Sequence, residues 1–305
     1  MNPYYTTDRS MLFNCTVEDF LNSPEAQSLR GKVQLIFTSP PFSLNSEKIY
    51  GNLKGNDYIK WLSDLAAPLT DLLTEDGSIC IELGNHWIKG QPFISMTPLV
   101  SFFKFLMKGR LNLCQEFIIF NSTRLPLPTK WVCVDKIRCK DQFNKLWWMS
   151  RNPRTKTRLN NVLVPYHEST RQQIRDRDRY TDKTVPSGHI FKRSSMNDNG
   201  GAIPSSVLQF KFTKSKGDDY LNYCNANNIP IHPARMQDAM AEFFVKFLTD
   251  EGDIVLDPFA GSNLTGFTAD RLGRRSVSIE PNWDYCKGSM GRWLNQGKTF
   301  LTSQV

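Results

Sequence analysis

The segment 253–280 constrains the fold of this chain more than any other part of the sequence. An apolar run at 253–256 enters a loop rich in small residues, and a helix is predicted at 265–272. A second apolar strand follows and ends in the acid Glu280. Small residues let a ligand approach the backbone, and a helix N-terminus offers free N–H groups. We therefore predict a βαβ unit that binds a nucleotide-like ligand, with an ordinary packing turn as the alternative.

The position of Glu280 supports the ligand-binding interpretation. In nucleotide pockets, an acid at the end of the second strand accepts hydrogen bonds from both ribose hydroxyls. The glycines of the preceding loop do not have the GxGxxG spacing that is typical of dinucleotide sites. The order of strand, small-residue turn, helix, strand and acid is the stronger signal.

A second loop, residues 38–42, reads Thr-Ser-Pro-Pro-Phe and follows a buried apolar strand at 33–37. The two prolines stiffen this loop and remove backbone donors, so its carbonyls can only accept hydrogen bonds. The loop can hold the Ser39 oxygen and two backbone carbonyls in a fixed arrangement beside the ring of Phe42. That arrangement suits an exocyclic amine whose two hydrogens are held while its nitrogen attacks. A simple turn at a strand end is the alternative.

Together, the two loops resemble those of the beta-class amino-group DNA methyltransferases, in which an S/D-P-P-Y/F loop precedes the S-adenosylmethionine loop. The resemblance covers nearly the whole chain, and the segments that carry it are 37–42, 50–53, 147–148, 186–189, 198–201, 232–235 and 261–263. It implies an α/β fold with a Rossmann-like methyltransferase sheet, a circularly permuted motif order and a loop-rich target-recognition insertion. Two departures are Ala260, where the family has glycine, and Glu82, where the family more often has aspartate.

The resemblance also implies the site residues and the cofactor, S-adenosyl-L-methionine. The catalytic loop consists of Ser39, Pro40, Pro41 and Phe42. The expected cofactor contacts are His232, Pro233, Ala234, Arg235, Asp257, Pro258, Phe259, Gly261, Ser262, Asn263 and Glu280. We expect Glu82 and Thr38 to support catalysis or to contact the cofactor. Structural roles are the alternatives for the ring of His232 and for Phe259, and Glu82 could equally be a surface acid.

The chemistry expected of this site is direct transfer of a methyl group to an amine. Cytosine N4 is a poor nucleophile because its lone pair is delocalised into the ring. Ser39 Oγ and a backbone carbonyl of the Ser39–Pro40 pair would hold both amino hydrogens and free the lone pair. A target base in duplex DNA must leave the stack, with Phe42 as the stacking plane and Phe120 or Trp131 as alternates. The serine favours cytosine N4, because the adenine-N6 enzymes of the family usually have D-P-P-Y/W.

Composition agrees with a nucleic-acid partner and excludes several other classes. A net charge of +8 and a pI of about 9.1 fit a polyanion, and much of the excess lies in the middle of the chain. The expected DNA-binding residues are Arg175, Arg177, Arg179, His189, Lys192 and Arg193, although a solvated basic face is the alternative. No cysteine follows a proline, which argues against the C5-cytosine methyltransferases. Seven cysteines without a CxxC predict neither a disulfide framework nor a metal site.

The predicted organisation is a catalytic half at 1–150, a target-recognition region at 151–229 and a cofactor-binding half at 230–305. Apolar periodicity predicts helices at 17–28, 58–73, 98–108 and 238–248 and strands at 78–83, 114–121 and 143–150. No apolar run of membrane-spanning length and no signal peptide is seen, which favours the cytoplasm.

The expected partner is double-stranded DNA within a restriction-modification system, with an endonuclease that is genetically linked but not bound. Adenine-N6 methylation, RNA methylation and a non-catalytic DNA-binding relative are the alternatives. The sequence predicts neither an oligomeric state nor a recognition sequence.

Overall fold

The computed structural model describes residues 1–43, 53–210, 218–294 and 300–302. Residues 50–52 of the family segment expected at 50–53 therefore lie outside the described residues. The chain divides into a larger unit, Met1–Thr157 with Ser206–Val305, and a smaller unit, Arg158–Ser205. The target-recognition region expected at 151–229 therefore includes residues of both units. Its later part belongs to the larger unit, because β9 (Val207–Gln209) pairs with the main sheet and α7 (Asp219–Ala226) packs against α10 and α11.

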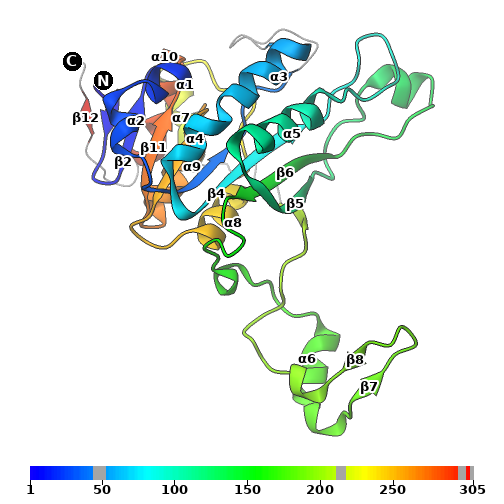
Figure 1. Ribbon diagram of the computed structural model, residues 1–305. Helices are drawn as coiled ribbons and strands as arrows, with labels where there is room; N and C mark the ends of the chain where they lie inside the picture. Colours follow the sequence, from blue (N-terminus) through cyan, green and yellow to red (C-terminus); the bar gives the residue numbers. More distant parts are fainter. Residues whose placement is uncertain (44–52, 211–217, 295–299, 303–305) are drawn as a thin grey trace. The chain divides into compact units, whose positions relative to one another are not determined.

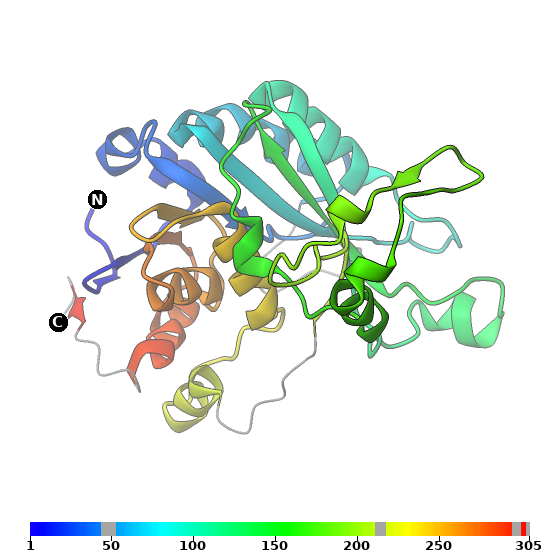
Figure 2. The ribbon, with the colours of Figure 1, turned by 90° about the horizontal axis from the view of Figure 1, so that it is seen from below.

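The larger unit is built around a single mixed sheet, which confirms the predicted α/β class (Figure 1). Within the described residues the strand order is β12-β1-β2-β11-β10-β3-β4-β6-β5-β9. The other strands are β1 (Tyr5–Thr6), β2 (Ser10–Phe13), β3 (Val33–Thr38), β4 (Leu73–Gly84), β5 (Asn112–Phe120), β6 (Phe143–Ser150), β10 (Ile254–Asp257), β11 (Arg275–Ile279) and β12 (Leu301–Thr302). The run from β2 to β4 is parallel, whereas β4, β6 and β5 pair antiparallel and lie side by side in Figure 2.

Besides α7, the α-helices of the larger unit are α1 (Val17–Leu21), α2 (Pro24–Ser28), α3 (Gly55–Asp64), α4 (Ala66–Leu72), α5 (Thr97–Gly109), α8 (Asp238–Leu248), α9 (Leu264–Arg271), α10 (Trp283–Ser289) and α11 (Gly291–Leu294). Helices cover both faces of the sheet, with α3, α4 and α5 on one side and α8 on the other (Figure 1). The helix predicted at 238–248 is confirmed. No helix in the described part of the chain is long and apolar enough to cross a membrane.

Two helices expected to be continuous are each divided in the structure. The helix expected at 17–28 is α1 and α2, because the Ser23 side chain caps a new helix that begins at Pro24. The helix expected at 58–73 is α3 and α4. Pro68, in the first turn of α4, has no N–H to bond the preceding turn, which favours a break before it.

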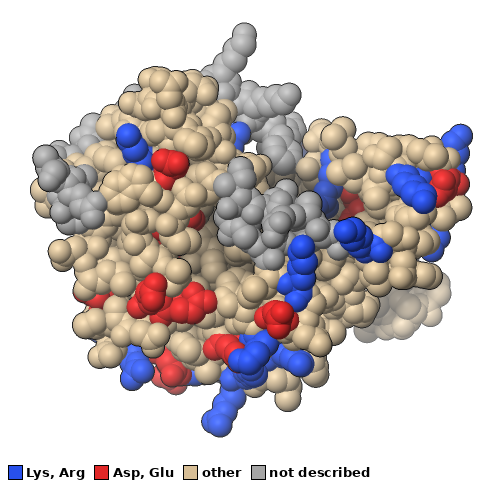
Figure 3. All heavy atoms as spheres, turned by 90° about the horizontal axis from the view of Figure 1, so that it is seen from above, with Lys and Arg blue, Asp and Glu red and all other residues tan. Residues whose placement is uncertain are grey.

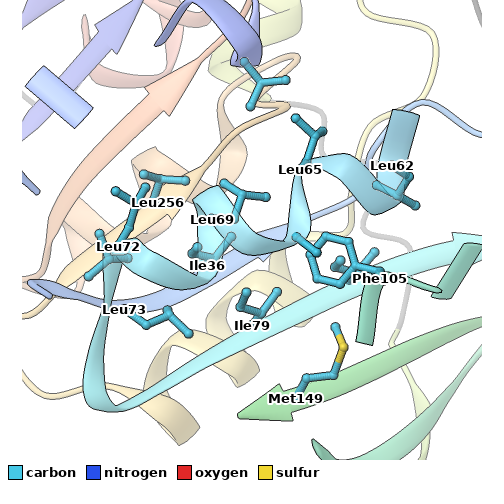
Figure 4. Close-up of a cluster of buried hydrophobic side chains, with 14 of the residues drawn as sticks. Ile36, Leu62, Leu65, Leu69, Leu72, Leu73, Ile79, Phe105, Met149 and Leu256 are labelled. Atoms are coloured by element: carbon cyan, nitrogen blue, oxygen red, sulfur yellow. The ribbon is translucent and has the colours of Figure 1, made fainter. Parts of the chain in front are cut away.

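Consecutive side chains of β3 point to opposite faces of the sheet, and both faces are buried, as is usual for a parallel strand. Ile36 packs with the leucines of α4, and Figure 4 shows them converging with Leu256 and Ile79 from the neighbouring strands. The next residue, Phe37, turns to the opposite face and stacks on Phe244 of α8 with ring centroids 5.3 Å apart. This double burial fixes where β3 ends, and therefore where the loop after it begins.

The central strands β3 and β10 form a topological switch point. They lie side by side and parallel, but the chain continues from β3 to β4 on one side and from β10 to β11 on the other. In open α/β sheets, the crevice at the carboxyl ends of such a strand pair is where ligands bind. The loops that follow β3 and β10 are the two motif loops of the sequence.

The smaller unit is rich in loops. It contains α6 (Glu168–Arg175) and a two-stranded hairpin of β7 (Lys183–Thr184) and β8 (Ile190–Phe191). Among its described side chains, Val162 is the apolar residue that is buried.

Candidate active site

A cavity of about 350 Å³ lies in the larger unit where β3 and β10 end. It brings together most residues that the sequence pointed to: Ser39, Pro40, Pro41, Phe42, Glu82, His232, Pro233, Ala234, Arg235, Asp257, Phe259, Gly261, Ser262 and Glu280. Thr38, Pro258 and Asn263 do not line it. The two loops, 219 residues apart at Thr38 and Asp257, thus form one site.

A hydrogen bond joins the two loops at their roots. Thr38 Oγ1 donates to Asp257 Oδ1 at 2.6 Å, and both side chains are buried. The Phe259 N–H donates to the same oxygen at 3.1 Å, and the Thr265 side chain also bonds the carboxylate. Burial raises the pKa of Asp257, and these hydrogen bonds oppose that rise. Asp257 therefore joins its own loop to the end of β3.

Ser39 is held by a buried carboxylate on the neighbouring strand. Glu82, near the end of β4, is 7% exposed and hydrogen-bonds the Ser39 side chain. Asn144 of β6 donates its Nδ2 to Glu82 Oε1 at 2.7 Å. Burial raises the pKa of Glu82, opposed by these two bonds and by the charge of Arg124. An ionised carboxylate only accepts, so the Ser39 hydroxyl donates to it and keeps its lone pairs for the cavity. The surface-acid alternative for Glu82 does not apply.

The ring of Phe42 lies against a glycine. A Cβ atom at Gly84 would lie 2.6 Å from Phe42 Cε2, so any other residue there would displace the ring. Phe42 also packs on the main core while lining the cavity. The alternates Phe120 and Trp131 do not line the cavity. Of the three aromatic residues considered as the stacking plane, Phe42 is therefore the one that lines the cavity with Ser39.

Glu280 presents a buried carboxylate at the cofactor end of the cavity. Its two oxygens each accept one backbone N–H at 2.8 Å, from Gly261 and from Asn282. Since a carboxylate oxygen has two lone pairs, each oxygen can still accept a second donor. Burial raises the pKa of Glu280 to about 7. Gly261 itself has φ +52, and a Cβ there would lie 3.0 Å from His232 Nε2.

The segment 232–235 forms another wall of the cavity and is held from behind. The His232 N–H donates to the Tyr220 hydroxyl at 2.8 Å, and its ring meets that of Tyr285 at a centroid distance of 4.6 Å. Burial lowers the pKa of His232 to about 4, so the ring is neutral at physiological pH. Arg235 pairs with Asp218 at 2.5 Å.

Asn263 has a structural position rather than a place in the cavity wall. It is 1% exposed, its amide donates to the Tyr5 hydroxyl at 2.9 Å, and its Oδ1 accepts from Ser278 at 2.8 Å. The adjacent Ser262 does line the cavity, and the buried Arg292 donates to its carbonyl at 2.6 Å and to its hydroxyl at 2.9 Å. These contacts hold the cofactor loop in shape from outside the cavity.

Sequence reasoning missed several polar residues of the cavity wall, among them Asn144 and Gln237. Asn144 Oδ1 and Gln237 Oε1 are both buried without a hydrogen-bond partner among the described residues. Gln237 occupies the N-cap position of α8 without a side-chain capping bond, and its place two residues after the 232–235 motif is its local signal in the sequence. Asn144 reaches the site through the antiparallel pairing of β6 with β4, which the sequence did not reveal.

The six residues expected to bind DNA all lie in the smaller unit. That unit has eight Lys and Arg against five Asp and Glu, and several of its arginines are paired within it. Arg175 pairs with Glu168 at 2.7 Å, Arg177 donates to Asn197 at 2.7 Å, and Arg193 pairs with Asp178. The side chain of Arg179 is 83% exposed.

Charge on the larger unit is mixed rather than segregated. The face in Figure 3 carries blue and red side chains near one another instead of one continuous basic field. Among the described residues there is no cluster of His, Cys, Asp and Glu that could hold a metal ion.

Comparison with known proteins identifies the family of this chain. The family model described as DNA methylase matches residues 33–291. The type II methyltransferase M.PvuII of Proteus hauseri is 36% identical over 96% of this chain and 86% of its own length. The DNA adenine methyltransferase YhdJ of Escherichia coli is 23% identical over 85% of this chain and 76% of its own length.

Solved structures agree as well. That of the cytosine-N4-specific PvuII DNA methyltransferase matches with a TM-score of 0.75 at 29% identity, covering 100% of this chain and 90% of the other. The complex of M1.HpyAVI with S-adenosylmethionine matches at 0.53 and 17% identity, covering 93% and 99%, and shows the fold alone. With its family model matched over most of its length, the chain belongs to the N6/N4 DNA methylase family.

Proposed function

We propose that this protein transfers a methyl group from S-adenosyl-L-methionine to the N4 amino group of a cytosine in double-stranded DNA. The observation that carries the proposal is the Ser39 hydroxyl, held by the buried Glu82 in the same cavity as the Glu280 carboxylate. The Ser39 hydroxyl can accept a hydrogen from an amine, and the Glu280 carboxylate can accept hydrogens from hydroxyls. The Thr38–Asp257 bond joins the two loops that form these parts of the site.

The cofactor half of the cavity fits S-adenosylmethionine. Glu280 can accept from two ribose hydroxyls, and Gly261, whose missing side chain leaves room for the His232 ring, holds one of its oxygens. The orphaned Gln237 Oε1 offers a further acceptor for a ligand N–H group, such as an ammonium. A cavity of about 350 Å³ lies in the range of small-molecule sites. When bound, the cofactor supplies a methyl group that leaves its sulfonium sulfur for the attacking nitrogen, and the sulfur keeps the electron pair.

The residues of this chain prepare the amine and remove a proton from it. Ser39 Oγ accepts one amino hydrogen, which draws the nitrogen lone pair out of conjugation with the ring. The methylated nitrogen then carries a positive charge and loses one hydrogen as a proton. Ser39 can take that proton while it passes its own to Glu82, whose raised pKa suits a proton acceptor. The product is the neutral methylated amine, and Glu82 releases the proton to solvent.

Two observations favour cytosine over adenine as the target. The loop carries Ser39, where adenine-N6 enzymes of the family usually carry aspartate, and the relative with 36% identity shares its name with a cytosine-N4-specific structure. The base reaches the cavity by leaving the DNA stack, which costs a few kcal/mol of unstacking. The Phe42 ring beside Ser39 provides a plane on which the extruded base can stack.

The biological setting belongs to the same proposal. As a type II-like methyltransferase the protein would protect DNA in the cytoplasm as part of a restriction-modification system. A cognate endonuclease would be genetically linked and would not need to bind this chain.

Nucleoside analysis tests the proposed activity. Unmethylated bacteriophage DNA treated with the wild-type protein and cofactor should yield N4-methylcytosine by mass spectrometry. Ser39→Ala should bind the cofactor normally but lose about 10²–10³ in single-turnover rate, because one hydrogen bond at the reacting centre is removed. Ser28→Ala, on the exposed surface of α2, is the matched control. N6-methyladenine alone would contradict the assigned base, and a normal rate for Ser39→Ala would contradict the assigned residue.

Glu280 gives a prediction for the pH dependence of cofactor binding. Its pKa of about 7 means that it holds a proton below pH 7, and ribose hydroxyls bind best to its ionised form. Affinity should therefore rise as pH increases from 6 to 8, with proton release on binding. His232, with a pKa of about 4, stays neutral over this range.

Calorimetry in two buffers of different ionisation enthalpy would measure that proton release. Glu280→Gln should abolish the Glu280 contribution and weaken binding by on the order of 10-fold, as expected for the loss of charge-assisted hydrogen bonds. Equal affinity and equal proton release in the variant and the wild type would show that Glu280 does not bind the ribose.

We further propose that the smaller unit grips and reads the DNA. Its composition supports this role: it has a basic excess, exposed arginines and little hydrophobic core, as expected of a recognition insertion. The residues proposed to contact DNA are Arg175, Arg177, Arg179, His189, Lys192 and Arg193. The pairing of Arg175 with Glu168 would keep that arginine oriented, at the cost of part of its charge.

Salt dependence tests this second proposal. Binding to phosphates releases counterions, so DNA affinity should fall steeply with salt, and each lost contact lowers the slope by about 0.9. The double variant Arg175→Ala with Arg177→Ala should flatten the slope by up to about 2, while cofactor affinity without DNA stays unchanged. A control with the same charge loss is Lys32→Ala with Lys104→Ala, two exposed positions of the larger unit. Identical slopes for both double variants would show that the smaller unit is only a solvated face.

A further inference from the structure

The loop between β5 and β6 is much longer than a hairpin requires. These two strands pair antiparallel, and about two to five residues join most strands of that kind, whereas residues 121–142 join them here. The loop is closed at its base, because the Asn121 N–H donates to the Gln142 carbonyl at 2.7 Å. In Figure 1 it extends past the ends of β5 and β6. Loops of this length in a compact domain usually serve a function of their own.

The β5–β6 loop begins and ends at the wall of the cavity. Asn121 and Arg124 at its start line the cavity, and so does Asn144 just after its end. A duplex that delivers a base to Ser39 must lie at the mouth of this cavity, because an extruded base stays attached to its own strand. The loop is therefore among the parts of the larger unit that lie nearest to bound DNA.

Side-chain bonds hold the β5–β6 loop against the segment that follows β4. Asn85 donates to Asp141 Oδ1 at 3.3 Å, and Arg138 Nε donates to the Pro92 carbonyl at 3.0 Å. Because β4 also carries Glu82, these bonds connect the loop to the strand that holds Ser39. The loop thus has a defined position beside the cavity.

The charge of the loop favours a polyanionic partner. It contains five Lys and Arg against two Asp and Glu. Four of its cations are exposed, namely Lys130, Lys136, Arg138 and Lys140. Within the described part of the chain none of these four forms an ion pair, whereas Arg175 and Arg193 of the smaller unit both do. Their charge is therefore available to phosphate groups.

The same loop exposes large apolar side chains. Those that are at least half exposed are Leu125, Leu127, Val134 and Ile137. An apolar patch alone would equally fit a protein partner, but the unpaired cations around this one and its place beside the cavity favour DNA. Proteins that distort a duplex often place apolar side chains against unstacked bases, and extrusion of a base is such a distortion.

We propose that the β5–β6 loop is a second DNA-binding surface, whose cations bind backbone phosphates beside the extruded base. This inference rests on the proposed function, because it takes the cavity as the place that receives the base. Contacts to phosphates position the duplex and carry no sequence information directly. The loop therefore adds affinity for any sequence, and the reading of a target sequence is left to the smaller unit.

Exposed cysteines allow a test on the unaltered protein. Cys133 and Cys139 lie in the loop, whereas Cys114, which is also exposed, lies at the end of β5 away from the loop. Alkylation of each cysteine by N-ethylmaleimide would be followed by mass spectrometry, with and without a saturating random-sequence duplex. DNA should slow alkylation of Cys133 and Cys139 several-fold and leave Cys114 unchanged. Unchanged alkylation of both loop cysteines would overturn the proposal.

Removal of charge from the loop gives a second test. Lys136→Gln with Lys140→Gln should flatten the salt dependence of affinity for the random-sequence duplex by up to about 1.8 in slope, since each lost phosphate contact removes about 0.9. Cofactor affinity without DNA should stay as in the wild type. Lys32→Gln with Lys104→Gln removes the same charge at exposed positions outside the loop and is the matched control. A slope equal to that of the control would contradict the assignment.

Failure of this inference can be distinguished from failure of the proposed function. Alkylation and salt dependence record DNA binding, whereas nucleoside analysis of the wild type records methyl transfer. A wild type that methylates DNA while its loop cysteines stay unprotected would overturn this inference alone. A wild type that protects those cysteines but yields no methylated nucleoside would contradict the proposed function and still support the loop as a DNA-binding surface.

Discussion

The hydrogen bond from Thr38 to Asp257 is the contact on which the site depends. It joins the ends of β3 and β10 at the point where the chain diverges to the two sides of the sheet. One loop carries the serine and the aromatic ring, and the other carries the small residues that lead to Glu280. Because both partners are buried, the bond is shielded from water, and Asp257 would lose one of its three donors without it. The sheet therefore builds two half-sites, and this bond sets their spacing.

Around that junction, buried acids act as organisers of neighbouring groups. Asp257 collects donors from its own loop and from β3, Glu82 orients Ser39 and Asn144, and Glu280 fixes Gly261 and Asn282. Burial raises the pKa of all three, which is the usual result of desolvating a carboxylate. Each acid uses part of its hydrogen-bonding capacity on the protein. Ser39, which Glu82 orients, lines the cavity, and so does Glu280 with its remaining lone pairs.

Local signals were sufficient to predict the parts of the fold and site that are contiguous in sequence. Apolar runs located β3, β10 and β11, and the turn chemistry of the two motif loops located the cavity. Contacts between distant strands could not be predicted in this way. Asn144 reaches the site only through the β4–β6 pairing, and Asn263, predicted to touch the cofactor, instead bonds Tyr5 from the opposite end of the chain. The bounds of the smaller unit could not be read from the sequence either, because basic charge extends beyond Arg158–Ser205 in both directions.

The most direct test of this account is the effect of Thr38→Val on both half-sites at once. The substitution keeps the shape of the side chain and removes its donor, and Thr38 does not line the cavity. The account predicts that cofactor affinity and single-turnover methylation both fall, each by on the order of 10-fold, since the loss of a hydrogen bond to a charged group costs about 1.5–3 kcal/mol. Thr38→Ser should retain both. A Thr38→Val protein that binds cofactor and methylates DNA like the wild type would contradict the claim that this bond sets the geometry of the site.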